Sequence, residues 1–216
     1  MPFNLSNYNK IESFVKKNAQ NKVKIIAISK YHPAESVQEA INSGLRIFGE
    51  NRVQEAKNKY LSLKTSFKDI ELHLTGPLQT NKVKNALQVF DVFQTLDREK
   101  LANEFYKYKE EVQNKSFFIQ VNTGKEVSKS GIYVENVDEF IKYCLHDLRL
   151  HVVGLMCIPP SFEKPAPHFS ILKNIAAKNN LKQLSMGMSR DYEEAILGGA
   201  THIRVGTSLF GSRDDK

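Results

Sequence analysis

The sequence predicts an α/β fold, a single (β/α)8 barrel preceded by one additional helix. Three observations support this: eight short apolar runs with strand character, helical periodicity between most of them, and a length of 216 residues. Barrels of this type span roughly 200 to 400 residues. Alternating strands and helices predict parallel strands joined by right-handed crossovers. An open doubly wound sheet is the alternative, but no glycine-rich dinucleotide-binding pattern follows the first apolar run.

The predicted strands are short runs rich in β-branched and aromatic residues, as expected for buried strands. They span Val23–Ser29, Ile47–Glu50, Glu71–Gly76, Val92–Asp97, Phe117–Asn122, Val152–Cys157, Gln183–Met188 and His202–Thr207. No change in composition marks a linker, so we expect residues 1–216 to form one domain.

Helix signals lie between the predicted strands. An additional helix is predicted at about Leu5–Gln20, ahead of the first strand. Pro33 can occupy a first helical position, and Thr80 can cap a helix that follows it. The periodic segment Asp191–Leu197 is followed by two glycines, which commonly end helices.

The composition is that of a globular protein, with 41% hydrophobic and 25% charged residues. Neither an amino-terminal signal sequence nor an apolar run of membrane-spanning length is evident, so no membrane association is expected. Cys144 and Cys157 have no metal-ligand spacing, and together these features predict a cytoplasmic protein. The net charge of +7 comes from scattered lysines rather than a basic arm, so no nucleic acid is expected as a partner.

Lys30 comes directly after the first predicted strand. A lysine at the end of a buried strand has its stem in apolar surroundings and its amine at the barrel opening. Desolvation there lowers the pKa of the amine, and a neutral amine can attack an aldehyde to form a Schiff base. The alternative for a lone lysine is an ordinary surface position at a strand end.

Small residues at the ends of the last two strands indicate an anion site. Gly206 permits close approach of the backbone, and the N–H groups of Gly206 and Thr207 can meet phosphate oxygens. Ser189, after the seventh strand, offers a hydroxyl at a second helix start. The loops after strands seven and eight are a common phosphate site in these barrels.

Other polar residues near the strand ends allow two interpretations each. Arg204 points either into the barrel mouth or outward to a helix carboxylate, because it alternates with apolar residues. Asn51 either contacts a ligand or caps the following helix. The favoured interpretation of His73 is a hydrogen-bonded core histidine, and that of Lys129 is an exposed loop lysine, the alternative being a second anion contact.

Several dispersed motifs, in order along nearly the whole chain, resemble the pyridoxal-phosphate homeostasis protein family, whose barrel is similar to the amino-terminal domain of alanine racemase. The matching segments are Ile28–Lys30, Phe48–Asn51 with Val53–Glu55, His73–Lys82, Ser128–Gly131, Gly154–Met156 with Ile158–Pro159, Leu184–Ser189, and Arg204–Thr207 with Phe210–Gly211.

The resemblance implies pyridoxal 5′-phosphate (PLP) as the cofactor, carried by Lys30 as a Schiff base. It further implies that Ser189, Gly206 and Thr207 hold the phosphate. Arg204 would face the pyridine nitrogen, and Asn51 would lie beside the cofactor. One departure is visible: many members resemble Lys-x-Lys at the Schiff-base position, whereas this chain has Tyr31 and His32 after Lys30.

Two functions of different classes follow. In the first, the protein carries PLP, contributes to vitamin B6 and amino-acid homeostasis, and delivers PLP to apo-enzymes without robust catalysis. In the second, it is an amino-acid racemase, which needs a base on each face of the substrate. Alanine racemases take one base from a further domain of a partner subunit. This sequence ends at Lys216, soon after the eighth strand, so we expect a monomeric carrier with no catalytic residues and no metal.

Overall fold

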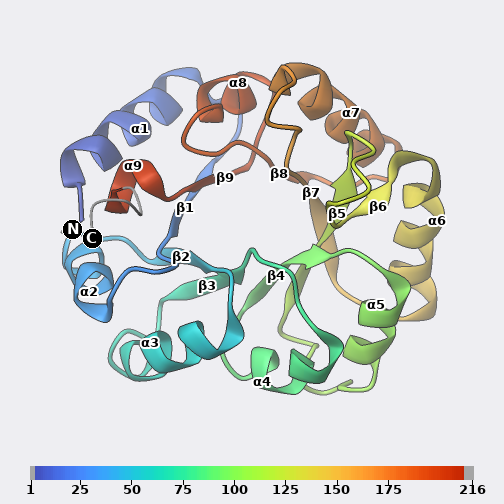
Figure 1. Cartoon of the computed structure of the whole chain (residues 1–216), viewed down its shortest axis with the longest axis horizontal. Coiled ribbons are helices and arrows are strands. Elements are labelled where there is room, and N and C mark those ends of the chain that lie inside the picture. Colours follow the sequence, from blue (N-terminus) through green and yellow to red (C-terminus); the bar gives the residue numbers. More distant parts are fainter. Residues whose placement is uncertain (1–2, 212–216) are drawn as a thin grey trace.

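The computed structural model describes residues 3–211, which form a closed parallel barrel surrounded by helices (Figure 1). The hydrogen-bonded order of the strands is β4-β3-β2-β1-β9-β8-β7-β5, and a pairing between β4 and β5 closes the ring. All pairings are parallel. The predicted (β/α)8 barrel is therefore confirmed, and the open-sheet alternative is wrong.

The strands of the closed ring match the eight predicted runs in number and order. They are β1 (Lys24–Ile28), β2 (Ile47–Glu50), β3 (Glu71–Leu74), β4 (Val92–Leu96), β5 (Ser116–Asn122), β7 (Val152–Cys157), β8 (Gln183–Ser185) and β9 (His202–Val205). A short strand that was not predicted, β6 (Ile132–Tyr133), pairs with the end of β5.

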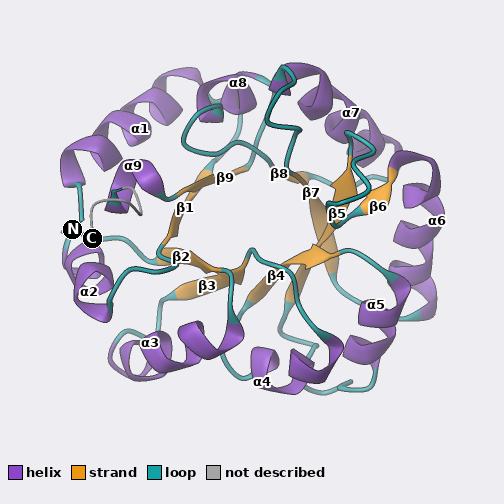
Figure 2. Ribbon diagram, viewed as in Figure 1, coloured by secondary structure: helices purple, strands orange, loops and turns teal. Residues whose placement is uncertain are grey.

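Helices cover the outside of the ring (Figure 2). They are α1 (Leu5–Asn18), α2 (Ala34–Asn42), α3 (Val53–Ser66), α4 (Val83–Leu87), α5 (Glu99–Tyr106), α6 (Val137–Lys142), α7 (Pro165–Lys178), α8 (Tyr192–Leu197) and α9 (Thr207–Phe210), with short helical turns at Thr80–Lys82, Val134–Asn136 and Tyr143–Asp147. The additional helix predicted at the amino terminus is α1, which packs against α8 and α9. In the part of the chain that the structure describes, no helix has both the length and the apolar character needed to cross a membrane.

Several predicted boundaries were wrong by a few residues. The eighth strand ends at Val205 rather than Thr207, because Thr207 already begins α9. The seventh strand ends at Ser185, where the chain turns through Met186–Ser189. Thr80 is the first residue of a short helical turn rather than the cap of a longer helix.

Side chains alternate along each strand between the barrel interior and the helix layer. The main apolar core lies between strands and helices and includes Ala27, Phe48 and Leu72. A smaller apolar cluster, formed by Val92, Phe118 and Met156, lies inside the barrel. The interior is thus filled by side chains, and chemistry is expected at its carboxyl-terminal end.

Candidate functional site at the carboxyl-terminal end of the barrel

Lys30 follows β1 on the side of the strand that faces the barrel interior. The main-chain N–H of Ser29 still donates to Gly49 on β2 at 3.0 Å, so the strand pairing continues to this point. A side chain on Gly49 would meet Ile26 and Ile28, so these residues share one face. The alternate residues Ala27 and Phe48 lie in the core beneath the helices, so the face of Ile28 is the interior one. Lys30 is half-buried in the turn after β1, two positions beyond Ile28, where continued alternation gives it the interior face.

The turn at Gly206 lies against the strand that carries Lys30. β1 and β9 pair in register, with Ala27 opposite Val205. A Cβ atom on Gly206 would lie 3.3 Å from both the Cβ and the carbonyl oxygen of Ile28. The structure therefore brings Lys30, Gly206 and Thr207 to neighbouring strand ends at one opening.

Thr207 is exposed and is the first residue of α9. Amides in the first turn of a helix have no intrahelical acceptor, so they are available to an anion. Ser189 lies nearby, because Ser189 and Ser208 line the same small cavity of about 470 Å³. The loop of Ser189 is held by Asp191, whose carboxylate accepts the N–H of Met188 at 2.6 Å.

Arg204 points into the barrel, so the inward interpretation is confirmed and the outward one is wrong. Its Nη1 donates to Ser185 Oγ at 2.7 Å, and its Nη2 donates to the carbonyl oxygen of Cys157 at 2.9 Å. The side chain is buried, and desolvation lowers the pKa of the guanidinium. A guanidinium has five N–H donors, so this group retains donors for a ligand.

A chain of hydrogen bonds continues from Ser185 through the barrel interior. Ser185 Oγ donates to Gln94 Oε1 at 2.7 Å, and Gln94 Nε2 lies 2.9 Å from His73 Nδ1. An amide nitrogen only donates, so Nδ1 accepts and Nε2 of His73 donates to Glu71 at 2.6 Å. Lys24 donates to both oxygens of Glu71 at 2.8 Å. The interpretation of His73 as a hydrogen-bonded core histidine is confirmed.

Ionisable groups in and beside this chain of hydrogen bonds have shifted pKa values. Burial lowers the pKa of His73, which keeps the imidazole neutral. Burial raises the pKa of the Glu71 carboxyl, but the hydrogen bonds from His73 and Lys24 and the charge of Lys24 outweigh it and lower that pKa to about 2. Burial also lowers the pKa of His202, beside His73, to about 3.

Asn51 does not cap α3, so the capping interpretation is wrong. Its Oδ1 accepts from the Thr75 hydroxyl at 2.9 Å, and the residue at the cap position of α3 is Arg52. Gly76 allows this arrangement, because a Cβ atom there would lie 2.4 Å from the carbonyl oxygen of Asn51. Two residues beyond Gly49, Asn51 shares the interior face and leaves its amide N–H groups for a ligand.

Lys129 is half-buried rather than exposed. It pairs with Glu126 at 2.7 Å and lies 3.4 Å from the carbonyl oxygen of Pro159. Its contacts join two loops at the carboxyl-terminal end. Cys144 and Cys157 are buried free thiols, and burial raises the pKa of each to about 12.

A buried charged cluster behind Lys30 was not predicted from the sequence. Lys59, on α3, donates to Glu50 at 2.7 Å and to the carbonyl oxygen of Ser29 at 2.8 Å. Ser29 Oγ donates to Glu50 at 2.7 Å and lies 2.7 Å from the hydroxyl of Tyr60. The spacing of Glu55 and Lys59 by four residues was the one available signal, because it predicts an ion pair on α3.

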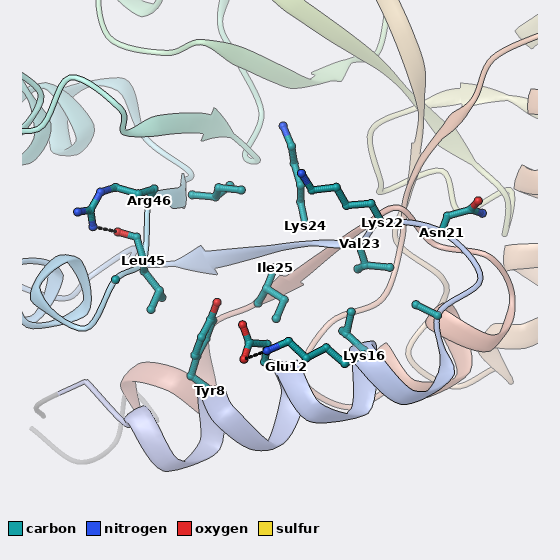
Figure 3. A pocket seen from close by; sticks show the side chains of 14 residues that line it. Tyr8, Glu12, Lys16, Asn21, Lys22, Val23, Lys24, Ile25, Leu45 and Arg46 are labelled. Carbon is teal, nitrogen blue, oxygen red and sulfur yellow. Dashed lines mark hydrogen bonds and ion pairs between the residues drawn. The ribbon is translucent and has the colours of Figure 1, made fainter.

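The cavity in Figure 3 lies at the opposite end of the barrel. It measures about 530 Å³ and is lined by residues of α1 and by the segments that precede β1 and β2. Lys16 pairs with Glu12 inside this cavity, while Lys24 pairs with Glu71 and Arg46 with Asp69. None of the six predicted site residues lines it.

The residues at the carboxyl-terminal end of the barrel offer a group for each part of PLP. The amine of Lys30 suits the aldehyde, and the glycine turn at Gly206 suits the phosphate. The guanidinium of Arg204, which retains N–H donors, suits the pyridine ring. The turn is also narrow enough at Gly206 that a side chain there would crowd β1. The residues present therefore fit the cofactor.

Comparisons with known proteins show which family the chain is similar to. The family model for the alanine racemase N-terminal domain matches residues 5–214. The pyridoxal phosphate homeostasis protein of Aquifex aeolicus is 42% identical over 205 residues, covering 90% of this chain and 89% of the relative. The one from Escherichia coli strain K12 is 35% identical over 202 residues, covering 89% and 86%.

Solved structures show the same likeness. PipY of Synechococcus elongatus, solved with PLP bound, is 32% identical with a TM-score of 0.83, covering 95% of this chain and 100% of PipY. Alanine racemase from Acinetobacter baumannii, at 18% identity and a TM-score of 0.73, shares the fold; the match covers 97% of this chain and 62% of the racemase. The chain belongs to the pyridoxal phosphate homeostasis protein family, and its barrel is an alanine racemase N-terminal domain.

Proposed function

We propose that this protein binds PLP covalently on Lys30 and carries it, contributing to vitamin B6 and amino-acid homeostasis. The observation that supports this most directly is the place of Lys30 directly after β1, whose end lies beside the glycine turn of the paired strand β9. When bound, PLP supplies an aldehyde that condenses with a neutral primary amine and releases water. PLP bound to the related PipY supports the same cofactor here.

The other site residues orient the cofactor. Ser189, Gly206 and Thr207 would hold the phosphate through hydroxyl and main-chain N–H groups. Arg204 would face the pyridine nitrogen, and because a guanidinium does not release its proton, it would leave that nitrogen unprotonated. Arg204 would thereby weaken electron withdrawal by the ring, which favours holding the cofactor over catalysis. Asn51 would contact the ring through its amide.

A carrier role is favoured over amino-acid racemisation. A racemase needs a proton-transferring group on each face of its substrate. His73 and His202 lie inside the barrel, but both ring nitrogens of His73 are in hydrogen bonds. Burial also lowers the pKa of both imidazoles, which makes each a weak base. The relatives' shared name, homeostasis protein, supports the same choice.

The remaining features of the proposal concern partners and location. PLP-dependent apo-enzymes are the proposed recipients of the cofactor, and the working unit is proposed to be a monomer. The proposed location is the cytoplasm, whose reducing conditions suit two buried free thiols.

Mass spectrometry after borohydride reduction tests the covalent site. The protein is loaded with PLP, reduced and digested, and the modified peptide is identified. We expect the adduct on Lys30 and a loss of visible absorbance after reduction. An adduct on another lysine, or none, would refute the proposal.

Incubation with single amino acids tests the carrier role. We expect the PLP-loaded protein to leave L-alanine and other amino acids unchanged, as followed by chiral chromatography. An alanine racemase run in parallel shows that the assay detects turnover. Racemisation by this protein at ordinary enzyme rates, about 1 to 1,000 per second, would establish the enzyme alternative instead.

A further inference from the structure

The main chain that carries Lys30 is held from behind by side chains of β2 and α3. Along β1 the side chains alternate, so Lys30 faces the interior and Ser29 faces α3. The contacts of Ser29 agree with this: its hydroxyl lies 2.7 Å from Glu50 Oε1 and 2.7 Å from Tyr60 Oη. Ser29 and Tyr60 are fully buried.

Lys59 is the centre of these contacts. Its ammonium group has three N–H donors, and the structure gives it three acceptors. These are the carbonyl oxygen of Ser29 at 2.8 Å, Glu50 Oε1 at 2.7 Å and Glu55 Oε1 at 3.1 Å. The Lys59 side chain is only 7% exposed, so its position is fixed by these acceptors.

The residue after Lys30 is held by the same group. Tyr31 has a φ of 66°, a left-handed conformation that residues other than glycine rarely adopt. Its main-chain N–H donates to Glu55 Oε1 at 2.5 Å, the oxygen that also accepts from Lys59. The guanidinium of Arg52 lies 5.5 Å from the centre of the Tyr31 ring. Lys30 therefore lies between two residues whose main-chain atoms contact one charged cluster.

Stability alone does not account for this cluster. Replacing a buried ion pair by apolar residues of similar volume is often neutral or stabilising. Glu50 is fully buried, and its Oε2 has no hydrogen-bond partner among residues 3–211. What the cluster does achieve is to fix the main chain on both sides of one residue.

We propose that Lys59, with Glu50 and Glu55, positions Lys30 for covalent capture of PLP. The inference rests on the proposed function, since it assigns a role toward the same lysine. Holding an amine in a productive geometry raises its effective concentration toward the bound aldehyde. The three residues would act on the cofactor only through the main chain at Ser29 and Tyr31.

Three variants on α3 test this role. Lys59→Met removes all three contacts, and Glu55→Ala removes the acceptor for the Tyr31 N–H at a partly exposed position. Glu55→Gln keeps an acceptor oxygen and serves as the conservative rescue. The matched control is Lys64→Met, because Lys64 on the same helix pairs with Asp91 at 2.5 Å and donates to the carbonyl oxygen of Val89. That control removes an ion pair of α3 without a contact to residues 29–31.

The measurements are PLP affinity from the visible band, the pH midpoint of that band, and urea unfolding of the PLP-free protein. We expect Lys59→Met and Glu55→Ala to weaken PLP binding about tenfold and to shift the pH midpoint by about half a unit. Glu55→Gln should stay within about twofold of the unsubstituted protein, because its oxygen still accepts the Tyr31 N–H. Lys64→Met should lower the unfolding midpoint and leave both cofactor measurements unchanged.

Two results would overturn the inference: unchanged affinity and pH midpoint in Glu55→Ala, or an equal loss of affinity in Lys64→Met. If Lys59→Met does not fold, the comparison of Glu55→Ala with Glu55→Gln decides the question. Borohydride mapping of the unsubstituted protein separates this inference from the proposed function. An unmodified Lys30 there refutes the function, whereas a modified Lys30 with insensitive Glu55 variants refutes only the positioning role.

Discussion

The two ends of the barrel carry similar charged side chains in different arrangements. At the amino-terminal end, Lys16, Lys24 and Arg46 each pair with a carboxylate, so their charges are largely cancelled. At the carboxyl-terminal end, Arg204 is held by a hydroxyl and a carbonyl oxygen, which are neutral, and Lys30 lies beside a glycine turn. The cavity shown in Figure 3 lies at the first of these two ends, away from the candidate site. The difference teaches that neutral partners can hold a cation in place without cancelling its charge, as Ser185 and Cys157 do for Arg204.

The largest expected effect is on the visible band of bound PLP, and it is tested by replacing one lysine at each end of the barrel. Lys30→Ala should abolish the visible band of the PLP-loaded protein, because the covalent link is lost. Lys24→Ala, at the amino-terminal end of the same strand, should keep the band. Absorbance spectra after loading with PLP and gel filtration measure both. A full band in Lys30→Ala would break the comparison.

A smaller effect is expected from the phosphate side of the site. Replacing Ser189 and Thr207 together by alanine should weaken PLP binding about 100-fold, equivalent to two charge-assisted hydrogen bonds. The matched control replaces Thr65 and Ser170 by alanine, since their hydroxyls donate to carbonyl oxygens within exposed helix turns. Equilibrium dialysis measures the affinity. If the two double variants bind PLP equally well, the phosphate lies elsewhere.

The smallest expected effect is on the pH dependence of the free energy of unfolding, through a histidine in the amino-terminal half of the barrel interior. His202 pairs in register with Lys24, and its pKa is lowered from 6.5 to about 3. In the unfolded chain the imidazole of His202 binds a proton below about pH 6.5, whereas in the folded chain it does so only near pH 3. Stability should therefore fall as pH decreases through this window, by about 2 kcal/mol between pH 7 and pH 5.

Urea unfolding at several pH values measures this dependence. The variant His202→Asn should show a shallower loss of stability over the same range, because asparagine does not titrate. An identical pH dependence in the two proteins would mean that His202 is not the group responsible.

Much of this arrangement could be predicted from the sequence. The number and order of the barrel strands follow from local periodicity, and the position of Lys30 follows from its place at a strand end. The direction of Arg204 could not be decided locally, because both faces of a barrel strand are buried and alternation alone does not distinguish them. It is fixed by Ser185 and Cys157, which are distant in sequence.

The cluster behind Lys30 was missed for a related reason. Lys59 is one of many lysines in helical segments, and its burial results from the packing of α3 against β2. Its acceptor on Ser29 lies 30 residues away in sequence. Short strands such as β6 are also difficult to predict, because two residues carry almost no periodic signal.

The packed interior of the barrel limits how a ligand can enter and leave. The chain of hydrogen bonds from Arg204 to Lys24 and the apolar plug of Val92, Phe118 and Met156 close the barrel to passage. A ligand seated at Lys30 must therefore leave through the opening by which it entered. Binding, release and any transfer of the ligand to another protein would all use the carboxyl-terminal opening of the barrel. A group that covers this opening would therefore block all three.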